Sequence, residues 1–388
     1  MPDILKIPAV FVRGGTSRAV FFHSSDLKDF SSQQIDSILL TVLGSPDNSG
    51  RQVDGLGGGF SSLSKAAIIS PSTMPDIDID FNFAQVSINS SFVDWSGTCG
   101  NISSAVGPFA INEGLVESTK PVTELRIRSV NTGKTFLCGV PVSEHGPISE
   151  GDFAIDGVPG TASRIYLKFY NPGGSLGKGV LPTKSPIDNI KIPSGEVYRA
   201  SVIDVGIPTI FVLAEELNHR MTATLEDLDN DWETKNILED IRCEVTVMLG
   251  LAPDLNTAHT EFQALPKIVM IEPKSSYIAR DKKKIDLDLI DLRAIAISMN
   301  QAHRTYPVSV SMATAAAAHM SGTLVSELTK NLRDRELCIG HPNGVMKVEI
   351  DVLESPDGWK VPSVTIFRTA RTIMEGKVIV PFSKLIAN

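Results

Sequence analysis

The sequence has few aromatic residues and no long apolar run. Aromatic residues make up 6% of the 388 residues and hydrophobic residues 42%, so burial alone can support folding without a metal or a disulfide. The longest apolar stretches, such as Ala9–Val12 and Val378–Phe382, are far shorter than the roughly 20 residues of a transmembrane helix. We therefore expect a globular protein with no membrane partner.

The cysteines show no pairing pattern. Cys99, Cys138, Cys243 and Cys338 lie far apart and form no CxxC pair. A strand-like run, Ile4–Val12, follows Met-Pro-Asp with no basic or apolar leader before it. We therefore expect free thiols in a reducing compartment and a cytoplasmic protein.

Motifs that would bind a cofactor are also missing. The glycine-rich stretch after Asp54 has Phe60 where a dinucleotide fingerprint requires its third glycine. Before Lys178, Pro172 stands in place of the first glycine of a phosphate-binding loop, and Gly179 replaces its Ser or Thr. The histidines have no zinc-ligand spacing, and no G-x-S-x-G turn indicates a serine hydrolase. We expect no metal, no redox cofactor and no organic cofactor.

The formal net charge is -9, which argues against a nucleic-acid or anionic-membrane partner. A negative net charge also does not attract an acidic small molecule. A polycarboxylate would therefore have to be held by hydrogen-bond donors close to it. The basic run Lys282–Lys284 is expected to be a solvated loop.

The chain reads as two copies of one plan. Each half is expected to hold a strand and turn, an amphipathic helix, a strand, a helix with small residues at its start, and two strands broken by a turn. In the first half these are Ile4–Phe22, Ser32–Leu43, Ile77–Phe83, Ser96–Gly114 and Thr123–Val142. In the second half they are Ala200–Leu213, Leu225–Met248, Lys267–Glu272, His303–Ser321 and Glu336–Leu353.

The last two landmarks of each half lie at nearly the same distance from their equivalents, and Cys99 and Pro307 are 208 residues apart. Asn131 and His341 are separated by 210 residues, and a period this long indicates a domain duplication. We place the domains at residues 1–185 and 186–388, with the Pro/Gly-rich stretch Asn171–Gly195 around the boundary. The last strand is free to return to the first domain. His341 itself is expected to be an exposed imidazole in a turn, with a place in the cleft as the alternative.

Lys65 ends the stretch that begins at Asp54 and precedes an apolar run, Ala66–Ile69. An apolar surrounding would lower the pKa of the amine, as a base near neutral pH requires. The alternative is a surface lysine on a solvated loop.

Cys99 lies in Ser-Gly-Thr-Cys-Gly-Asn, directly before the expected helix. Unpaired N–H groups and the helix dipole at such a point stabilise a thiolate and attract carboxylates. The alternative is a buried cysteine that packs as a small hydrophobic residue, which is our expectation for the other three.

The sequence resembles the 2-methylaconitate cis–trans isomerase (PrpF-type) family over nearly the whole chain. The motifs that carry the resemblance are Arg13–Arg18, Asp54–Lys65, Gly97–Asn101, Asn131–Gly133, Gly177–Lys178 ahead of Leu181–Thr183, His303–Tyr306, Gly340–Gly344 and Arg368–Gly376. The family is similar in fold to diaminopimelate epimerase. The resemblance therefore implies an α+β fold of two pseudo-symmetric domains, each a central helix wrapped by mostly antiparallel strands, with the active site between them.

Diaminopimelate epimerase and proline racemase use one cysteine from each half. Cys99 fits the first, but the equivalent stretch of the second half, Tyr306–Ser309, has none. In the 2-methylaconitate isomerase group a lysine takes part instead, and it maps onto Lys65. The resemblance thus implies Lys65 and Cys99 as the proton-transfer residues.

The implied activity is cofactor-independent isomerisation of unsaturated di- or tricarboxylates such as 2-methylaconitate or aconitate. Lys65 would remove an allylic proton, and return of a proton would shift the double bond or exchange cis and trans geometry. Fixed donors would stabilise the developing charge. The expected substrate-binding residues are Thr16, Ser17, Arg18, Gly57, Gly58, Ser61, Gly100, Asn101, Ser309, Ser311 and Met312.

Three alternatives stay open. One is a 4-oxalomesaconate-type tautomerase; another is an amino-acid racemase or epimerase, against which the missing second cysteine counts. The third is a non-catalytic accessory protein that only binds its ligand. The oligomeric state is also open, and a homodimer would be ordinary.

Overall fold

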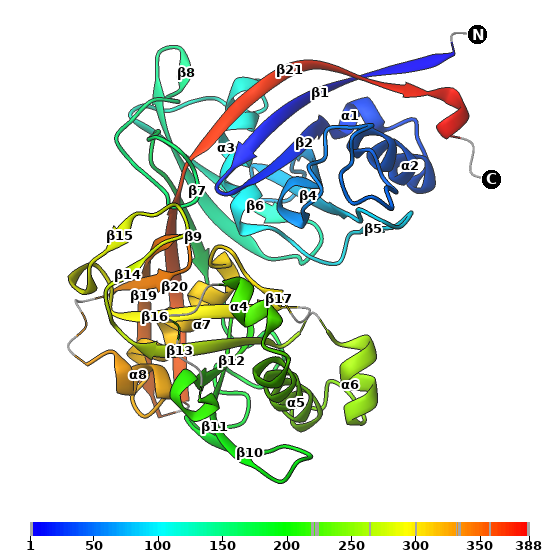
Figure 1. Ribbon diagram of the computed structural model, residues 1–388. Helices are drawn as coiled ribbons and strands as arrows, with labels where there is room; N and C mark the ends of the chain where they lie inside the picture. The colour runs from blue at the N-terminus through cyan, green and yellow to red at the C-terminus, as the bar shows by residue number, and fades with distance from the viewer. Residues whose placement is uncertain are drawn as a thin grey trace. The chain divides into compact units, whose positions relative to one another are not determined.

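The protein is described by a computed structural model in which the chain forms two compact units, Met1–Lys168 with Phe367–Asn388, and Phe169–Ile366. Figure 1 shows each unit as a sheet with helices packed on it. The structure describes residues 3–385 except 219–220, 222–224, 264, 299–300, 331, 333–334 and 357. None of the helices in these ranges is both long and apolar enough to cross a membrane.

The first unit is built on a mixed sheet whose neighbouring strands run β21–β1–β2–β3–β4–β6–β7. The pairs β2–β3 and β4–β6 are parallel and the others antiparallel. The strands are β1 (Ile4–Gly14), β2 (Ser17–His23), β3 (Lys65–Pro71), β4 (Ile79–Val86), β5 (Val93–Asp94), β6 (Val122–Ser129), β7 (Thr135–Ser143), β8 (Gly146–Pro147), β9 (Ile165–Tyr170) and β21 (Ala370–Pro381). The helices are α1 (Ser24–Leu27), α2 (Ser32–Leu43), η1 (Ser61–Leu63), α3 (Gly100–Asn112) and η4 (Phe382–Lys384).

Helix α3 is the central helix of this unit. It is buried nearly all round, as its small and apolar sequence requires, and it contacts β1, β2, β7, β8 and β21. The buried hydroxyls of Ser103 and Ser104 donate to the carbonyls of Cys99 and Asn101, so neither hydroxyl is left unpaired in the core. A side chain at Gly107 would lie within 2.8 Å of β7 atoms, so glycine permits the close approach of this strand.

The second unit repeats the plan with the order β10–β11–β12–β13–β16–β18–β19–β20. The strands are β10 (Asp188–Lys191), β11 (Val197–Val205), β12 (Ile207–Leu213), β13 (Lys267–Pro273), β14 (Tyr277–Ile278), β15 (Lys284–Ile285), β16 (Leu292–Ser298), β17 (Gln301–Ala302), β18 (Glu336–His341), β19 (Gly344–Ser355) and β20 (Gly358–Arg368). The helices are η2 (Ala214–Leu217), α4 (Leu225–Asn230), α5 (Trp232–Met248), α6 (Leu255–Glu261), η3 (Leu287–Leu289), α7 (Val308–His319) and α8 (Leu324–Leu328).

The two sheets share one pattern of strand directions. The parallel pairs β12–β13 and β16–β18 occupy the places of β2–β3 and β4–β6. Helix α7 stands in the second unit where α3 stands in the first, and it is buried in the same way. The expected internal repeat is therefore present in the strand order as well as in the sequence.

The compact units divide at Lys168–Phe169, which differs from the boundary expected after residue 185. The Pro/Gly-rich stretch lies with the second unit because Asp204 of β11 fixes it. The Asp204 side chain is fully buried and accepts from the Leu176 N–H and the Ser175 hydroxyl. The return of residues 367–388 to the first unit agrees with the freedom allowed to the last strand.

Candidate functional site

Lys65 is the first residue of β3 and is buried, with 7% of its surface exposed. Its amine donates to the side-chain carbonyl of Gln85 on β4 and lies 5.2 Å from the centre of the Phe83 ring. Burial lowers the pKa of Lys65, and Cys99 acts in the opposite direction. The alternative of a solvated surface lysine is therefore wrong.

Cys99 is the N-cap of α3 and is only half-buried. Its side chain makes no capping hydrogen bond, so the sulfur does not cap the N-terminus of α3. Its effect on the pKa of Lys65 shows that the structure brings the two predicted proton-transfer residues together. Cys138, Cys243 and Cys338 are buried free thiols, as predicted.

Arg368, at the end of β20, joins this group, although it was not among the residues expected to bind substrate. It is 8% exposed, and its Nε donates to Oδ1 of Asn101 over 3.2 Å. Burial lowers the pKa of Arg368 to about 10, while Cys99 acts in the opposite direction. A buried cation thus lies near the thiol. Only its place in a recognised motif pointed to it, because the return of the last strands to the first unit could not be read locally.

Asn101 connects three parts of the site. Its Nδ2 donates to the Thr16 hydroxyl, and its Oδ1 accepts from Arg368. Gly15, with φ of +50°, has no room for a side chain because the Asn101 amide would lie 2.2 Å from its Cβ. The turn between β1 and β2, the start of α3 and Arg368 are therefore held by one side chain.

The other residues expected from this turn lie beside the glycine-rich loop. Ser17 is buried. The Arg18 guanidinium lies 5.4 Å from the Phe11 ring centre, and its Nη2 is next to Gly58, where a Cβ would be 3.0 Å away. Arg18 is half-buried, so it is not a freely exposed surface arginine.

The glycine-rich loop is organised by a buried side chain, Gln52. Its amide donates to the hydroxyls of Ser45 and Ser64, and its Oε1 accepts from the Gly59 N–H. Gly57 was expected to bind substrate, but its N–H donates to the carbonyl of Leu43 and is therefore not a free donor for a ligand. Glycine is required there because a Cβ would meet Gln52 at 2.4 Å. Gly58 is half-buried and Ser61 is exposed.

The expected donors of the second unit lie at the start of α7, which begins at Val308. Ser309 falls in its first turn, where N–H groups have no partner within the helix. The Ser311 N–H donates to the carbonyl of Pro307, and its hydroxyl donates to Val308. Ser311 and the buried Met312 therefore lie one turn too far along the helix to act as free backbone donors.

His341 ends β18 and is 5% exposed, so the expectation of an exposed turn imidazole is wrong. Its ring stacks on Tyr306, with centroids 6.3 Å apart, and its Nδ1 accepts from the Asn343 N–H. The turn after His341 is tight, and the strand pair buries the imidazole. The run Lys282–Lys284 is exposed, as predicted.

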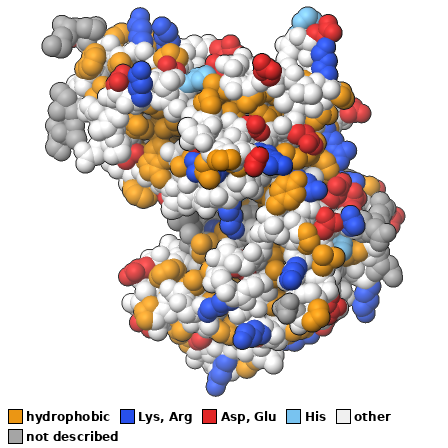
Figure 2. Space-filling model, turned by 180° about the vertical axis from the view of Figure 1, so that it is seen from behind, with side chains coloured by type: hydrophobic (Ala, Val, Ile, Leu, Met, Phe, Trp, Pro, Cys, Tyr) orange, Lys and Arg blue, Asp and Glu red, His pale blue; other side chains and the backbone are white. Residues whose placement is uncertain are grey.

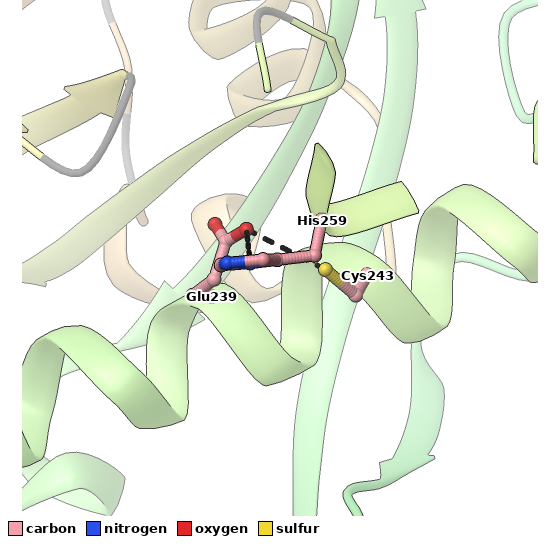
Figure 3. A group of neighbouring side chains, drawn as sticks. All are labelled: Glu239, Cys243 and His259. Atoms are coloured by element: carbon pink, nitrogen blue, oxygen red, sulfur yellow. Dashed lines mark hydrogen bonds and ion pairs between the residues drawn. The ribbon is translucent and has the colours of Figure 1, made fainter. Parts of the chain in front are cut away.

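One group of side chains has the composition of a metal site. Glu239 and Cys243 of α5 and His259 of α6 place their donor atoms within 4.8 Å of one another (Figure 3). However, Arg242 donates to both Glu239 carboxylate oxygens and lies 3.3 Å from the Cys243 sulfur. Burial and the Glu239 carboxylate raise the pKa of Cys243 to about 12. A guanidinium thus occupies the carboxylate that a cation would need, and we assign the cluster the role of joining α6 to α5.

The surface carries charges of both signs. Figure 2 shows Lys and Arg side chains interspersed with Asp and Glu on the face that it presents. Together with the net charge of -9, this means that the surface has no overall positive charge that would attract an anion over a long range.

The sequence matches the family described as PrpF protein over residues 4–381. The chain belongs to this family. It is 37% identical to 2-methyl-aconitate isomerase of Cupriavidus necator, over 97% of this chain and 98% of that protein. It is 38% identical to 3-methylitaconate isomerase of Eubacterium barkeri, over 100% of both chains. The prediction of an isomerase of this family is therefore confirmed.

Solved structures agree with the expected architecture. The crystal structure of a methylitaconate-delta-isomerase aligns with a TM-score of 0.85 at 36% identity, over 100% of this chain and 98% of that one. A hydroxyproline epimerase from Agrobacterium vitis aligns with a TM-score of 0.53 at 10% identity, over 98% of this chain and 94% of that one, which shows the fold alone. The α+β epimerase-like fold is thus confirmed.

Proposed function

We propose that this PrpF-family isomerase moves a proton within an unsaturated di- or tricarboxylate related to 2-methylaconitate and 3-methylitaconate, with Lys65 as the base. The observation that carries the proposal is the buried Lys65 amine beside Cys99. Relatives with these two substrates in their names are equally similar to the chain. Both acids have an allylic C–H next to a double bond that is conjugated with a carboxylate, so one proton-transfer mechanism serves both.

The reaction starts with Lys65 in its neutral form. Its nitrogen takes the allylic proton and becomes an ammonium, while the C–H electron pair spreads over the double bond into the carboxylate. A proton returned to a different carbon gives the shifted double bond. Rotation before the return exchanges cis and trans geometry. Protons and electrons balance within the substrate and the side chain, so the proposed reaction needs no cofactor.

The developing negative charge lies next to fixed positive groups. The first N–H groups of α3, at Gly100 and Asn101, have no partner within the helix. The Arg368 guanidinium is held by Asn101. Groups that are already oriented stabilise the charge without reorganising during the reaction. Cys99 supports the reaction as second acid–base group or as a hydrogen-bond donor to the intermediate.

A racemase is the second candidate, and the N-caps of the central helices count against it. The N-cap of α3 is Cys99, whereas the N-cap of α7 is Pro307. The second thiol of a two-thiol racemase would stand at the position of Pro307. A 4-oxalomesaconate-type tautomerase uses the same proton transfer and is separated from the leading proposal by its substrate alone.

Proton NMR in D₂O tests the proposal. The wild-type protein, Lys65→Met, Cys99→Ser and Lys134→Met are each mixed with 2-methylaconitate, trans-aconitate, 3-methylitaconate or 4-oxalomesaconate. New isomer signals with deuterium at an allylic carbon are expected for wild type and for Lys134→Met, which changes an exposed lysine. Lys65→Met should lose at least about 100-fold in rate, the contribution typical of a general base. Exchange that survives in Lys65→Met would show that another group is the base.

The same experiment separates catalysis from mere binding. Line broadening or saturation transfer without any new isomer from any acid would favour the accessory binding protein. We also propose a cytoplasmic setting, supported by four cysteines that are all free thiols. A contribution of both halves to one active site, and a homodimer, remain predictions.

A further inference from the structure

We propose that Gln85 is the positioning residue for the Lys65 amine and that its neutral side chain keeps this amine available as a base. The inference rests on the proposed function, since it concerns the same proton transfer. Gln85 faces Lys65 across the β3–β4 pair, and its side-chain carbonyl accepts from the Lys65 amine.

The orientation of the Gln85 amide is fixed by its other end. Its Nε2 donates to the Ser64 carbonyl over 2.9 Å and to the Ser61 carbonyl over 3.1 Å. Both amide hydrogens are therefore used, and a flipped amide would place its NH₂ group against the amine. Oε1 is left facing Lys65, and the last residues before β3 are tied to β4 by the same side chain.

This contact suits a lysine that must change its charge. A neutral amine donates one N–H to Oε1, and its lone pair then points away from Gln85. The ammonium formed after proton abstraction donates to the same oxygen. The contact is therefore kept in both states, and the amine does not have to turn between them. A base held in this way has its lone pair directed before the substrate arrives.

The neutral side chain of Gln85 also matters for the charge of Lys65. A carboxylate at this position would favour the ammonium and raise the pKa of Lys65, typically by 1–3 units for an opposite charge within about 4–6 Å. Phe83 on the same face of β4 is also uncharged. The charged or titratable groups on the elements beside β3, on β5 and at the rest of the site are Arg18 and His23 of β2, Asp80 of β4, Asp26 of α1, Asp94 of β5, Cys99 at the start of α3 and Arg368 of β20. Of these, Cys99 is the one that acts on the pKa of Lys65.

The test compares Gln85→Glu, Gln85→Met and a matched control, Asn82→Asp. Asn82 lies on the opposite face of β4, where its side-chain carbonyl accepts from the Asn131 amide. Asn82→Asp therefore adds the same negative charge to β4, but on the face that does not carry Gln85. Each variant carries ¹³C-labelled lysine, and the Lys65 Cε signal, assigned by its loss in Lys65→Met, is followed against pH. Circular dichroism and thermal melting show that each variant is folded.

In Gln85→Glu the Lys65 titration should move up by at least about one pH unit, as expected for a new carboxylate beside an ammonium. The ascending limb of kcat/KM should move with it, so that activity returns at high pH. Gln85→Met should show no upward movement but should lose at least about tenfold in kcat, because the amine is no longer oriented. Asn82→Asp should shift the titration by less than about 0.3 unit, as expected for a screened charge.

Two results would overturn the inference. One is a Lys65 titration in folded Gln85→Glu that does not differ from wild type. The other is a kcat in Gln85→Met within about twofold of wild type, which is too small for a lost orientation effect. If the wild-type protein isomerises none of the acids, the proposed function fails. The NMR titration then still decides whether Gln85 sets the charge of Lys65.

Discussion

The burial of Lys65 predicts a pH-dependent cost in stability. In the folded protein the pKa of Lys65 lies below its ordinary value of 10.5, mainly because the amine is buried. Between the lowered value and 10.5, the unfolded chain binds more protons than the folded chain, so folding stability rises with pH. The full penalty is present below the folded-state pKa and is gone above 10.5. Lys65→Met keeps the apolar stem but removes the proton, so it should lack this dependence.

The expected magnitude follows from the linkage of one proton. Each pH unit within the window changes the wild-type free energy of unfolding by about 1.4 kcal/mol, and that of Lys65→Met by none from this site. The substitution also removes the hydrogen bond to Gln85, at a cost of about 0.5–1.5 kcal/mol. Lys65→Met should therefore be more stable than wild type on the acid side of the window. It should be equal or slightly less stable above 10.5.

The assay is denaturant unfolding at a series of pH values. The first unit contains Trp95, and the second contains Trp232 and Trp359. Replacing the latter two by Phe gives a protein whose fluorescence reports the first unit alone. Lys134→Met, which removes an exposed lysine, supplies the baseline for loss of one charge. A difference between wild type and Lys65→Met that is the same at every pH would refute the reasoning, because it would mean that folding does not change the proton affinity of Lys65.

Three further outcomes are expected. Asn101→Ala should destabilise the first unit by about 1–3 kcal/mol in the same fluorescence assay, since buried Arg368 loses an acceptor, and it should also lower kcat. Arg242→Met should destabilise the second unit by about 3–5 kcal/mol in urea unfolding, because the partly buried Glu239 carboxylate loses its ion pair; no loss would contradict a structural role for the cluster. Gly107→Ala should cost about 1–3 kcal/mol by thermal melting, as its Cβ would overlap β7; a neutral result would mean that β7 moves freely.

The spacing of apolar residues predicted most of the helices and strands, because such a pattern lies within one short stretch of sequence. The expected helix Ser32–Leu43 has the observed bounds, which a Ser31–Gln34 capping box and Gly44 at φ of +75° define. The stretch Leu225–Met248 was expected as one helix. It forms two, because the Asp231 side chain accepts from the Thr234 N–H and starts a new helix. A competing cap inside a helical pattern is visible in the sequence, but its strength depends on packing.

Those residues of the candidate site that belong to a recognisable sequence motif could be predicted from the sequence. Lys65 and Cys99 were identified from the family motifs, and the structure brings them together. Gln85 was missed because its role depends on the β3–β4 register, which no local pattern fixes. The sequence also could not show which N–H groups of the expected substrate-binding residues Gly57 and Ser311 are free. Their N–H groups are taken by backbone carbonyls, and such pairing appears only when the chain is folded.

The two halves share one fold but differ in the reactive side chains at equivalent positions. β3 and β13 both begin with a lysine, Lys65 and Lys267. Burial, and secondly the charge of Arg242, lower the pKa of Lys267 to about 8, so both halves hold a lysine whose pKa is lowered from its ordinary value. However, the residue before the central helix is Cys99 in one half and Pro307 in the other. A thiol therefore precedes the central helix in the first half alone.

This asymmetry favours double-bond migration over racemisation. A racemase must remove and return protons on opposite faces of one carbon, which requires two opposed acid–base groups. Migration moves a proton between two carbons, and Lys65 can do both steps from one side. The ammonium of Lys65 then carries the substrate's own proton, so some product formed in D₂O should keep protium at the new position. Mass spectrometry of the first turnover, with deuterium-labelled substrate in H₂O as the converse experiment, measures this return. Complete solvent exchange in both directions would refute a direct return of the substrate's proton, since the proton on Lys65 would then be lost to solvent or a separate group would supply the new one.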